Sequence, residues 1–133
     1  MLSAKRLKIA AATVCLSPQH LVMARLEIDH IIPVAKGGNS EELNLWLACP
    51  ICNGYKGSQT EFSDPETGVT VPIFNPRTHV WHEHFSWSND GLIIVGQTPI
   101  GRATVVALNL SDDPDVLLVR SYWILAGWHP PQR

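Results

Sequence analysis

The chain has few cysteines, no long hydrophobic run and no excess of charge of either sign. Three cysteines among 133 residues are an odd number, which disfavours a secreted domain stapled by disulfides. No apolar segment approaches the roughly 20 residues that a membrane-spanning helix needs. The formal net charge of −2 excludes a protein that coats nucleic acid through a general positive field. We therefore expect a cytoplasmic protein, in a reducing compartment, that makes no membrane contact.

The composition that remains is typical of a folded domain. Hydrophobic residues make up 45% of the chain and charged residues 17%, a balance that supports a buried core and disfavours disorder. A length of 133 residues favours a single compact unit. Residues 1–16 carry cations before a short apolar run, as weak signal peptides do, but no convincing small-residue cleavage site precedes Cys15. We predict a helix over residues 3–14 instead, with Ser3 as its N-cap.

Turn signals divide the first half of the chain into short elements. Alternating apolar and polar residues at 25–34 predict a half-buried strand. Ser40, followed by two glutamates, predicts the start of a short helix that continues through Leu47. Trp46 would then lie on the apolar side of this helix. A second short helix is predicted directly after Cys52.

The second half of the chain predicts a loop, a hairpin and two helices. Residues 63–78 contain three prolines and are expected to be looped or extended. Residues 79–87 and 92–98 flank an Asp-Gly pair, which predicts a β-hairpin. Two helices that begin at prolines are predicted after it, over residues 99–108 and 111–127.

One constellation of polar residues carries chemistry. Asp29 and His30 place a metal-binding carboxylate beside an imidazole, which can take a proton from water near neutral pH. Asn44 supplies an amide that can hold a backbone segment in position. Asn53 supplies an oxygen that suits a hard cation such as Mg²⁺. These residue types offer oxygen ligands for a cation beside a group that can act as a general base.

The cysteines indicate half of a zinc site. Cys49 and Cys52 are separated by two residues, the spacing of a zinc knuckle, whose four ligands must come partly from elsewhere. Cys15 is the third cysteine, and His20 is a weak candidate for the fourth ligand. The alternative is that the thiols bind no metal and are buried as small hydrophobic groups.

Three blocks, EIDHIIPVAKGGNS, ELNLWLAC and CPICNGYKG, together resemble the HNH nucleases, which have the ββα-metal fold. The pieces DPETG, FNPR and the terminal GWHPP resemble a bacterial subgroup with a C-terminal extension. The resemblance implies an α+β fold, with an HNH core that includes a degenerate zinc knuckle over residues 1–62. The extension over residues 63–133, a hairpin and two helices, would pack on the core as one compact unit.

The resemblance also implies a role for each site residue. His30 matches the general base, Asp29 and Asn53 match the ligands of a catalytic Mg²⁺ or Mn²⁺, and Asn44 matches the asparagine that braces the loop. The implied reaction is hydrolysis of DNA phosphodiester bonds. The chain departs from the family at Ala12, where a fourth zinc-binding cysteine is common. The alternative is therefore a catalytically impaired HNH-fold protein that binds DNA or serves as an accessory factor.

Several basic side chains are candidates for other contacts. Lys36, Lys56 and Arg77 are candidate phosphate contacts, although each also fits an ordinary solvated surface cation. His82 and His84 would share one face of a predicted strand. A metal site there lacks an evident third ligand, which favours a plain solvent-facing strand.

Overall fold

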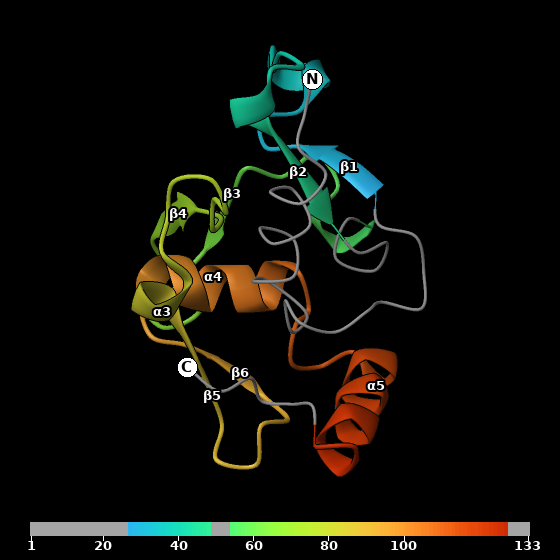
Figure 1. Cartoon of the computed structure of the whole chain (residues 1–133). Coiled ribbons are helices and arrows are strands. Elements are labelled where there is room, and N and C mark those ends of the chain that lie inside the picture. Colours follow the sequence, from blue (N-terminus) through green and yellow to red (C-terminus); the bar gives the residue numbers. More distant parts are fainter. Residues whose placement is uncertain (1–26, 49–53, 128–133) are drawn as a thin grey trace.

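The computed structural model describes residues 27–48 and 54–127 of the chain (Figure 1). Helices and strands are mixed in it, which confirms the predicted α+β class. Several predictions lie outside the described residues, namely the helix over residues 3–14, the cysteines Cys15, Cys49 and Cys52, and the two candidate ligands His20 and Asn53.

The first unit is a two-stranded antiparallel sheet. Strand β1 (Glu27–His30) pairs with β2 (Leu45–Ala48), and a helical turn follows at residues 54–56. The order of elements is therefore strand, strand, helix, as the ββα resemblance implies. The loop between the strands contains two short 3-10 helices, η1 (Val34–Lys36) and η2 (Glu42–Asn44).

The predicted helix through Leu47 is wrong beyond its first turn. Only Glu42–Asn44 is helical, and Leu45–Ala48 is a strand in which Leu45 pairs with His30. Trp46 therefore lies in a strand, opposite Asp29. The local N-terminal signals start a turn of helix, but pairing with β1 supplies backbone hydrogen bonds that extend the following residues.

A second hairpin overlaps the region of residues 63–78, which was expected to be looped or extended. Strands β3 (Glu61–Ser63) and β4 (Thr70–Pro72) are antiparallel, and Phe62 pairs with Val71. Pro72 is compatible with this pairing because the sheet has only two strands, so its missing N–H faces an edge. The predicted boundary between residues 62 and 63 falls inside β3.

The third hairpin confirms the prediction from the Asp-Gly pair, but its first strand is shorter than expected. Strand β5 (Phe85–Trp87) pairs with β6 (Ile94–Gly96), and Gly91 has a φ of 76° in the connecting turn. The residues before β5 form helix α3 (Trp81–His84). The expected strand face shared by His82 and His84 is therefore wrong.

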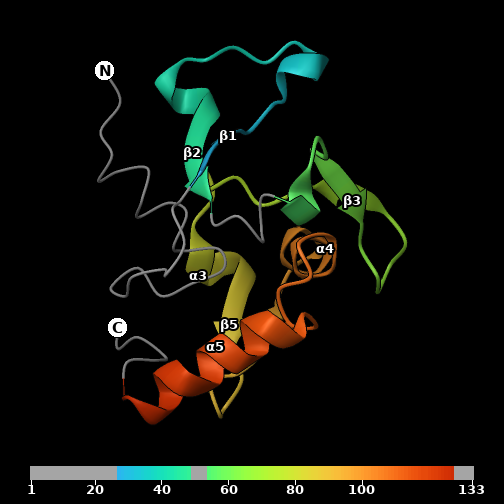
Figure 2. The same ribbon diagram turned by 90° about the vertical axis from the view of Figure 1, so that its right-hand side faces the viewer.

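The two helices that begin at prolines are confirmed. Helix α4 (Pro99–Ala107) is capped by the Thr98 side chain, which accepts a hydrogen bond from the Gly101 N–H at 3.0 Å. Helix α5 (Pro114–Leu125) is capped in the same way by Asp113. Helix α4 lies at the centre of the molecule and contacts α3, β3, β4 and β6 (Figures 1 and 2).

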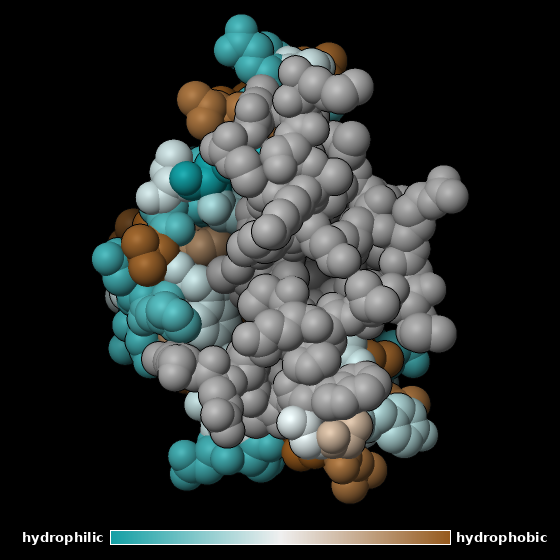
Figure 3. Space-filling view, viewed as in Figure 1, coloured by the Kyte–Doolittle hydropathy of each residue, from teal (hydrophilic) through white to brown (hydrophobic). Residues whose placement is uncertain are grey.

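The hydrophobic core joins β2 to the C-terminal half of the chain. Leu45 is buried in one cluster with side chains from the C-terminal elements: Ile73, Phe74, Trp81, Phe85, Ile94, Ala107, Leu108 and Leu110. Helix α5 leaves several hydrophobic side chains exposed, including Leu118, Tyr122 and Leu125. Figure 3, in the same view as Figure 1, shows hydrophobic residues in brown at the lower right, where α5 lies. Within residues 27–48 and 54–127, no helix is long and apolar enough to cross a membrane.

Candidate functional site

Asp29 and His30 lie side by side at the end of β1, and one buried lysine contacts both. The Lys56 Nζ atom is 2.9 Å from Asp29 Oδ2 and donates a hydrogen bond of 3.1 Å to the His30 carbonyl oxygen. Lys56 reaches this position from the helical turn at residues 54–56 and is only 5% exposed. The ammonium group therefore fixes the Asp29 carboxylate against the backbone of the neighbouring histidine.

This position differs from the one expected for Lys56 as a phosphate contact. Such a contact requires an exposed ammonium group, whereas the structure places it inside the protein, beside a carboxylate. The role could not be predicted from the sequence, because Asp29 and Lys56 are 27 positions apart and no spacing rule links a strand residue to a later helical turn.

The His30 imidazole contacts the hydroxyl group of Ser40, which was predicted to start a helix. His30 Nε2 lies 3.1 Å from Ser40 Oγ. Where this hydroxyl accepts the Nε2 proton, Nδ1 keeps a free lone pair and can act as a base. Ser40 was expected to cap a helix, and its proximity to His30 depends on how the intervening loop folds.

The Asn44 amide holds that loop through three hydrogen bonds. Its Nδ2 donates to the carbonyl oxygens of Ile32, at 3.0 Å, and Asn39, at 2.7 Å. Its Oδ1 accepts the Ile32 N–H at 2.8 Å. This pattern is what the bracing role expected of Asn44 requires.

The conformation and close packing of the same loop explain why it contains two consecutive glycines. A Cβ atom on Gly38 would overlap the Ile32 carbonyl oxygen, so no larger residue fits at this crossing of the chain. Gly37 has a φ of 88°, a left-handed conformation that glycine adopts without strain. The crossing brings the end of the loop, with Ser40, back toward His30.

The two other predicted phosphate contacts are in different surroundings. Lys36 ends η1 and is exposed. Arg77 is partly buried, and its Nε donates a hydrogen bond of 2.9 Å to the Leu45 carbonyl oxygen. Arg77 thus ties the C-terminal half of the chain to β2, the partner strand of Asp29 and His30.

Among the described residues around β1, Asp29 supplies one ligand type for a hard divalent cation, and the Lys56 ammonium group lies 2.9 Å from its Oδ2 atom. Asp29 offers carboxylate oxygens, the ligand type that Mg²⁺ and Mn²⁺ prefer. In the part of the chain that the structure describes, no three histidine, cysteine, aspartate or glutamate side chains gather as a metal site. Asn53, the expected second ligand, and the three cysteines lie outside that part.

Comparison with known proteins agrees with this arrangement. Residues 13–59 match the family model described as HNH endonuclease, a segment that contains Asp29, His30, Asn44 and Lys56. No curated protein and no solved structure matched the chain. The match supports an HNH assignment for the segment of residues 13–59.

Proposed function

We propose that the protein is a metal-dependent endonuclease that hydrolyses DNA phosphodiester bonds. The main observation behind the proposal is that Asp29 and His30, which are adjacent on β1, are each held by a neighbouring side chain. Ser40 contacts the His30 imidazole, and Lys56 holds the Asp29 carboxylate. Both members of the pair lie in the segment that matches the HNH family. Such support from neighbouring groups is what a reacting base and a metal ligand need to keep a fixed geometry.

The proposed reaction uses His30 as the general base. Nδ1 takes a proton from a water molecule, whose oxygen forms a bond to phosphorus while the bond to the leaving oxygen breaks. A divalent cation held by Asp29 and Asn53, when bound, would polarise the phosphate and stabilise the charge of the leaving oxygen. Ser40 keeps the imidazole in the tautomer that the proton transfer requires.

Binding to DNA is expected to be local. With a net charge of −2, attraction must come from a few placed cations, which gives a weak dependence of affinity on salt. Lys36 is the best placed of the three predicted contacts, because it is exposed on the loop that carries Ser40. Arg77 is proposed as a second contact, and it is less well placed than Lys36 because its Nη2 atom is buried and its Nε atom is bonded to the Leu45 carbonyl oxygen.

Two further expectations accompany this proposal. A structural Zn²⁺ held by Cys15, Cys49 and Cys52, with His20 as a weak fourth candidate, would fix the segment that carries Asn53. The alternative of a catalytically impaired DNA-binding protein is less favoured, because Asp29, His30 and Asn44 are all present.

Cleavage of supercoiled plasmid in Mg²⁺ or Mn²⁺ tests the proposed function. Wild type is expected to nick or linearise the plasmid, and His30→Ala is expected to lose at least about a hundredfold in rate, the typical contribution of a general base. His82→Ala is the matched control, because His82 is exposed on α3, outside the site. Equal cutting by wild type and His30→Ala, or intact plasmid with folded wild type in both metals, would contradict the proposal.

A further inference from the structure

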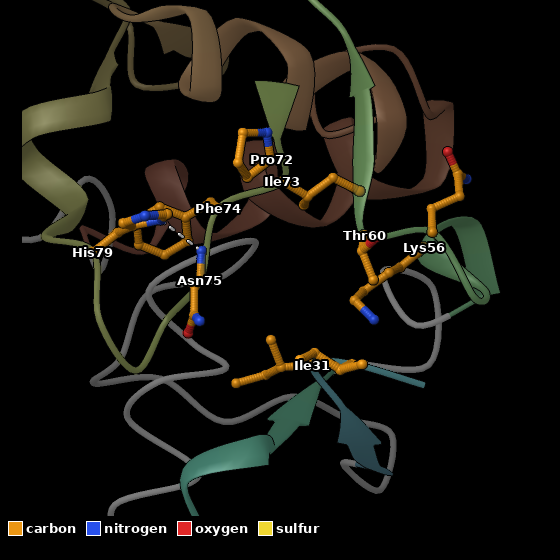
Figure 4. Close-up of a pocket in the computed structure, with 10 residues that line it drawn as sticks. Ile31, Lys56, Thr60, Pro72, Ile73, Phe74, Asn75 and His79 are labelled. Carbon is orange, nitrogen blue, oxygen red and sulfur yellow. Dashed lines mark hydrogen bonds between the residues drawn. The ribbon is translucent and has the colours of Figure 1, made fainter. Parts of the chain in front are cut away.

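A cavity of about 240 Å³ lies beside the candidate active site (Figure 4). One wall is formed by Ile31 and Ile32, which follow His30 directly in the chain. In Figure 4, the opposite side is formed by the segment from Pro72 to Asn75, which follows β4. The cavity therefore lies where the HNH segment meets the C-terminal half of the chain.

The hydrophobic walls of this cavity include an aromatic pair. The Phe74 and His79 rings both line it, with centroids 5.7 Å apart. The His79 Nδ1 atom accepts the Asn75 N–H at 2.9 Å, so Nε2 carries the proton of the neutral ring. Burial, together with the nearby His84, lowers the pKa of His79, which favours this neutral form. The two rings are tilted by 49° to each other, and Phe74 is buried, so the uncharged His79 ring is the more accessible of the two.

Polar groups interrupt the hydrophobic walls. Lys56, Gln59, Thr60 and Asn75 also line the cavity. The Thr60 side chain makes no hydrogen bond to any residue in the described ranges, so its hydroxyl is available as donor and acceptor. Mostly apolar walls with a few convergent polar groups are the usual anatomy of a ligand pocket.

Lys56 belongs both to this cavity and to the candidate active site. Its ammonium group contacts Asp29 and the backbone of His30, and its side chain lines the cavity. Figure 4 shows this ammonium directed toward Ile31. Only the Lys56 side chain would therefore separate a group in the cavity from the Asp29 carboxylate. A nucleotide whose phosphate is cleaved at Asp29 and His30 could then place its base in the cavity.

We propose that this cavity receives one base of the DNA substrate, turned out of the helical stack beside the phosphodiester that is cleaved. The proposal rests on the proposed nuclease function. The cavity is smaller than the roughly 300 Å³ at which pockets for drug-sized ligands begin, and it suits a single heterocycle. The half-buried His79 ring offers a stacking surface that tolerates any base, and the polar groups offer partners for a base edge.

The proposal predicts a preference for DNA that already contains an unpaired base. Extruding a paired base costs free energy, and the cost is smallest for a mismatched or unpaired nucleotide. Duplexes with a one-nucleotide bulge should therefore bind more tightly than fully paired duplexes. An abasic bulge, which has a similar backbone but lacks the base, separates recognition of the base from recognition of bent DNA.

The experiment measures binding of three duplexes by the His30→Ala protein in Mg²⁺: fully paired, bulged and abasic-bulged. The bulged duplex is expected to bind about tenfold more tightly than the other two, since stacking of one base is worth about that factor. Equal affinity for the bulged and abasic-bulged duplexes would overturn the cavity proposal. Plasmid cleavage by wild type, measured in parallel, shows separately whether the nuclease function holds.

A variant that fills the cavity tests whether the preference for the bulged duplex depends on the cavity. Thr60→Phe is expected to bring the bulged and abasic-bulged duplexes to similar affinity, because the added ring occupies the cavity. Thr70→Phe is the matched control, since Thr70 is exposed in the same hairpin and does not line the cavity; it should keep the tenfold preference. An undiminished preference in folded Thr60→Phe would overturn the proposal. Should Thr60→Phe not fold, the comparison of bulged with abasic-bulged DNA decides alone.

Discussion

The Nζ atom of Lys56 lies 2.9 Å from Oδ2 of Asp29, and both side chains are shielded from water, with 6% and 13% of their surface exposed. A lysine and an aspartate buried together depend on each other, because either charge alone would be poorly solvated. The pair connects the helical turn at residues 54–56 to β1. It therefore links the stability of the site to the position of the carboxylate proposed to bind metal.

Replacing Lys56 tests this dependence. Lys56→Met is expected to lower the free energy of unfolding by about 3 kcal/mol, the typical cost of removing one partner of a buried ion pair. Urea denaturation at neutral pH measures it. Lys36→Met removes an exposed cation from the same unit and should change stability by less than about 0.5 kcal/mol. Similar losses in both variants would contradict the structural role of Lys56.

Changing the Asn44 amide tests the brace of the loop. Asn44→Asp keeps an oxygen that can accept the Ile32 N–H but removes the donor to two carbonyl groups. We expect a loss of about 1–3 kcal/mol in the free energy of unfolding, because backbone carbonyls lose their partner, together with slower plasmid cleavage. Asn89→Asp, in the exposed β5–β6 turn, is the control for the added charge. A stable, fully active Asn44→Asp protein would show that the brace is dispensable.

Ser40 is expected to act on the reaction only through His30. Ser40→Ala should reduce the rate of cleavage at saturating DNA by about tenfold, because the imidazole loses the partner that fixes its tautomer. DNA affinity should be unchanged. Ser40→Thr keeps the hydroxyl and should restore most of the rate. A drop in affinity with an unchanged rate would instead indicate that Ser40 contacts the substrate.

The buried ion pair of the C-terminal half predicts acid sensitivity. Arg102 donates two hydrogen bonds of 2.9 Å to the Asp64 carboxylate. These bonds, with further ones from the Glu66 N–H and the Thr67 hydroxyl, hold the pKa of Asp64 far below its usual value, although burial opposes the shift. Because the folded state lowers this pKa, the stabilisation is present above about pH 4 and is lost as the pH falls toward the folded value.

Asp64→Asn removes this contribution. The variant should be less stable than wild type at pH 7, and it should lose less stability between pH 7 and pH 3. Urea denaturation at a series of pH values measures both effects. Asp112→Asn, an exposed carboxylate outside the ion pair, is expected to follow wild type. Parallel stability curves for wild type and Asp64→Asn would contradict the predicted linkage.

Local signals in the sequence predicted the parts of the fold that depend on local interactions. The prolines at positions 99 and 114 were sufficient to predict α4 and α5, although α5 begins three residues later than predicted. The Asp-Gly pair was sufficient for the β5–β6 turn. These features need no partner from elsewhere in the chain, so their sequences determine them.

The errors concern segments whose structure depends on distant partners. Leu45–Ala48 follows helix-starting residues but becomes a strand because β1 pairs with it. The β3–β4 hairpin was missed because prolines suggested a loop, although Pro72 fits an edge position. At the candidate site, Asp29 and His30 were predicted from their chemistry and from the resemblance to the HNH nucleases, and they stay a prediction. Their partners Ser40 and Lys56 were not predicted as such, because each contact depends on the fold of a loop or the packing of a helical turn.

The burial of Leu45 among side chains of the C-terminal half has a consequence for how this protein can change. The strand opposite Asp29 and His30 is anchored in a core that lies almost entirely beyond the segment matched by the family. Substitutions at Phe74 or Phe85 are therefore expected to affect the packing of β2, because mutations of residues in contact have coupled effects on stability. The segment that matches the HNH family therefore shares its core with the second half of the chain, and we expect it to need that half in order to fold stably.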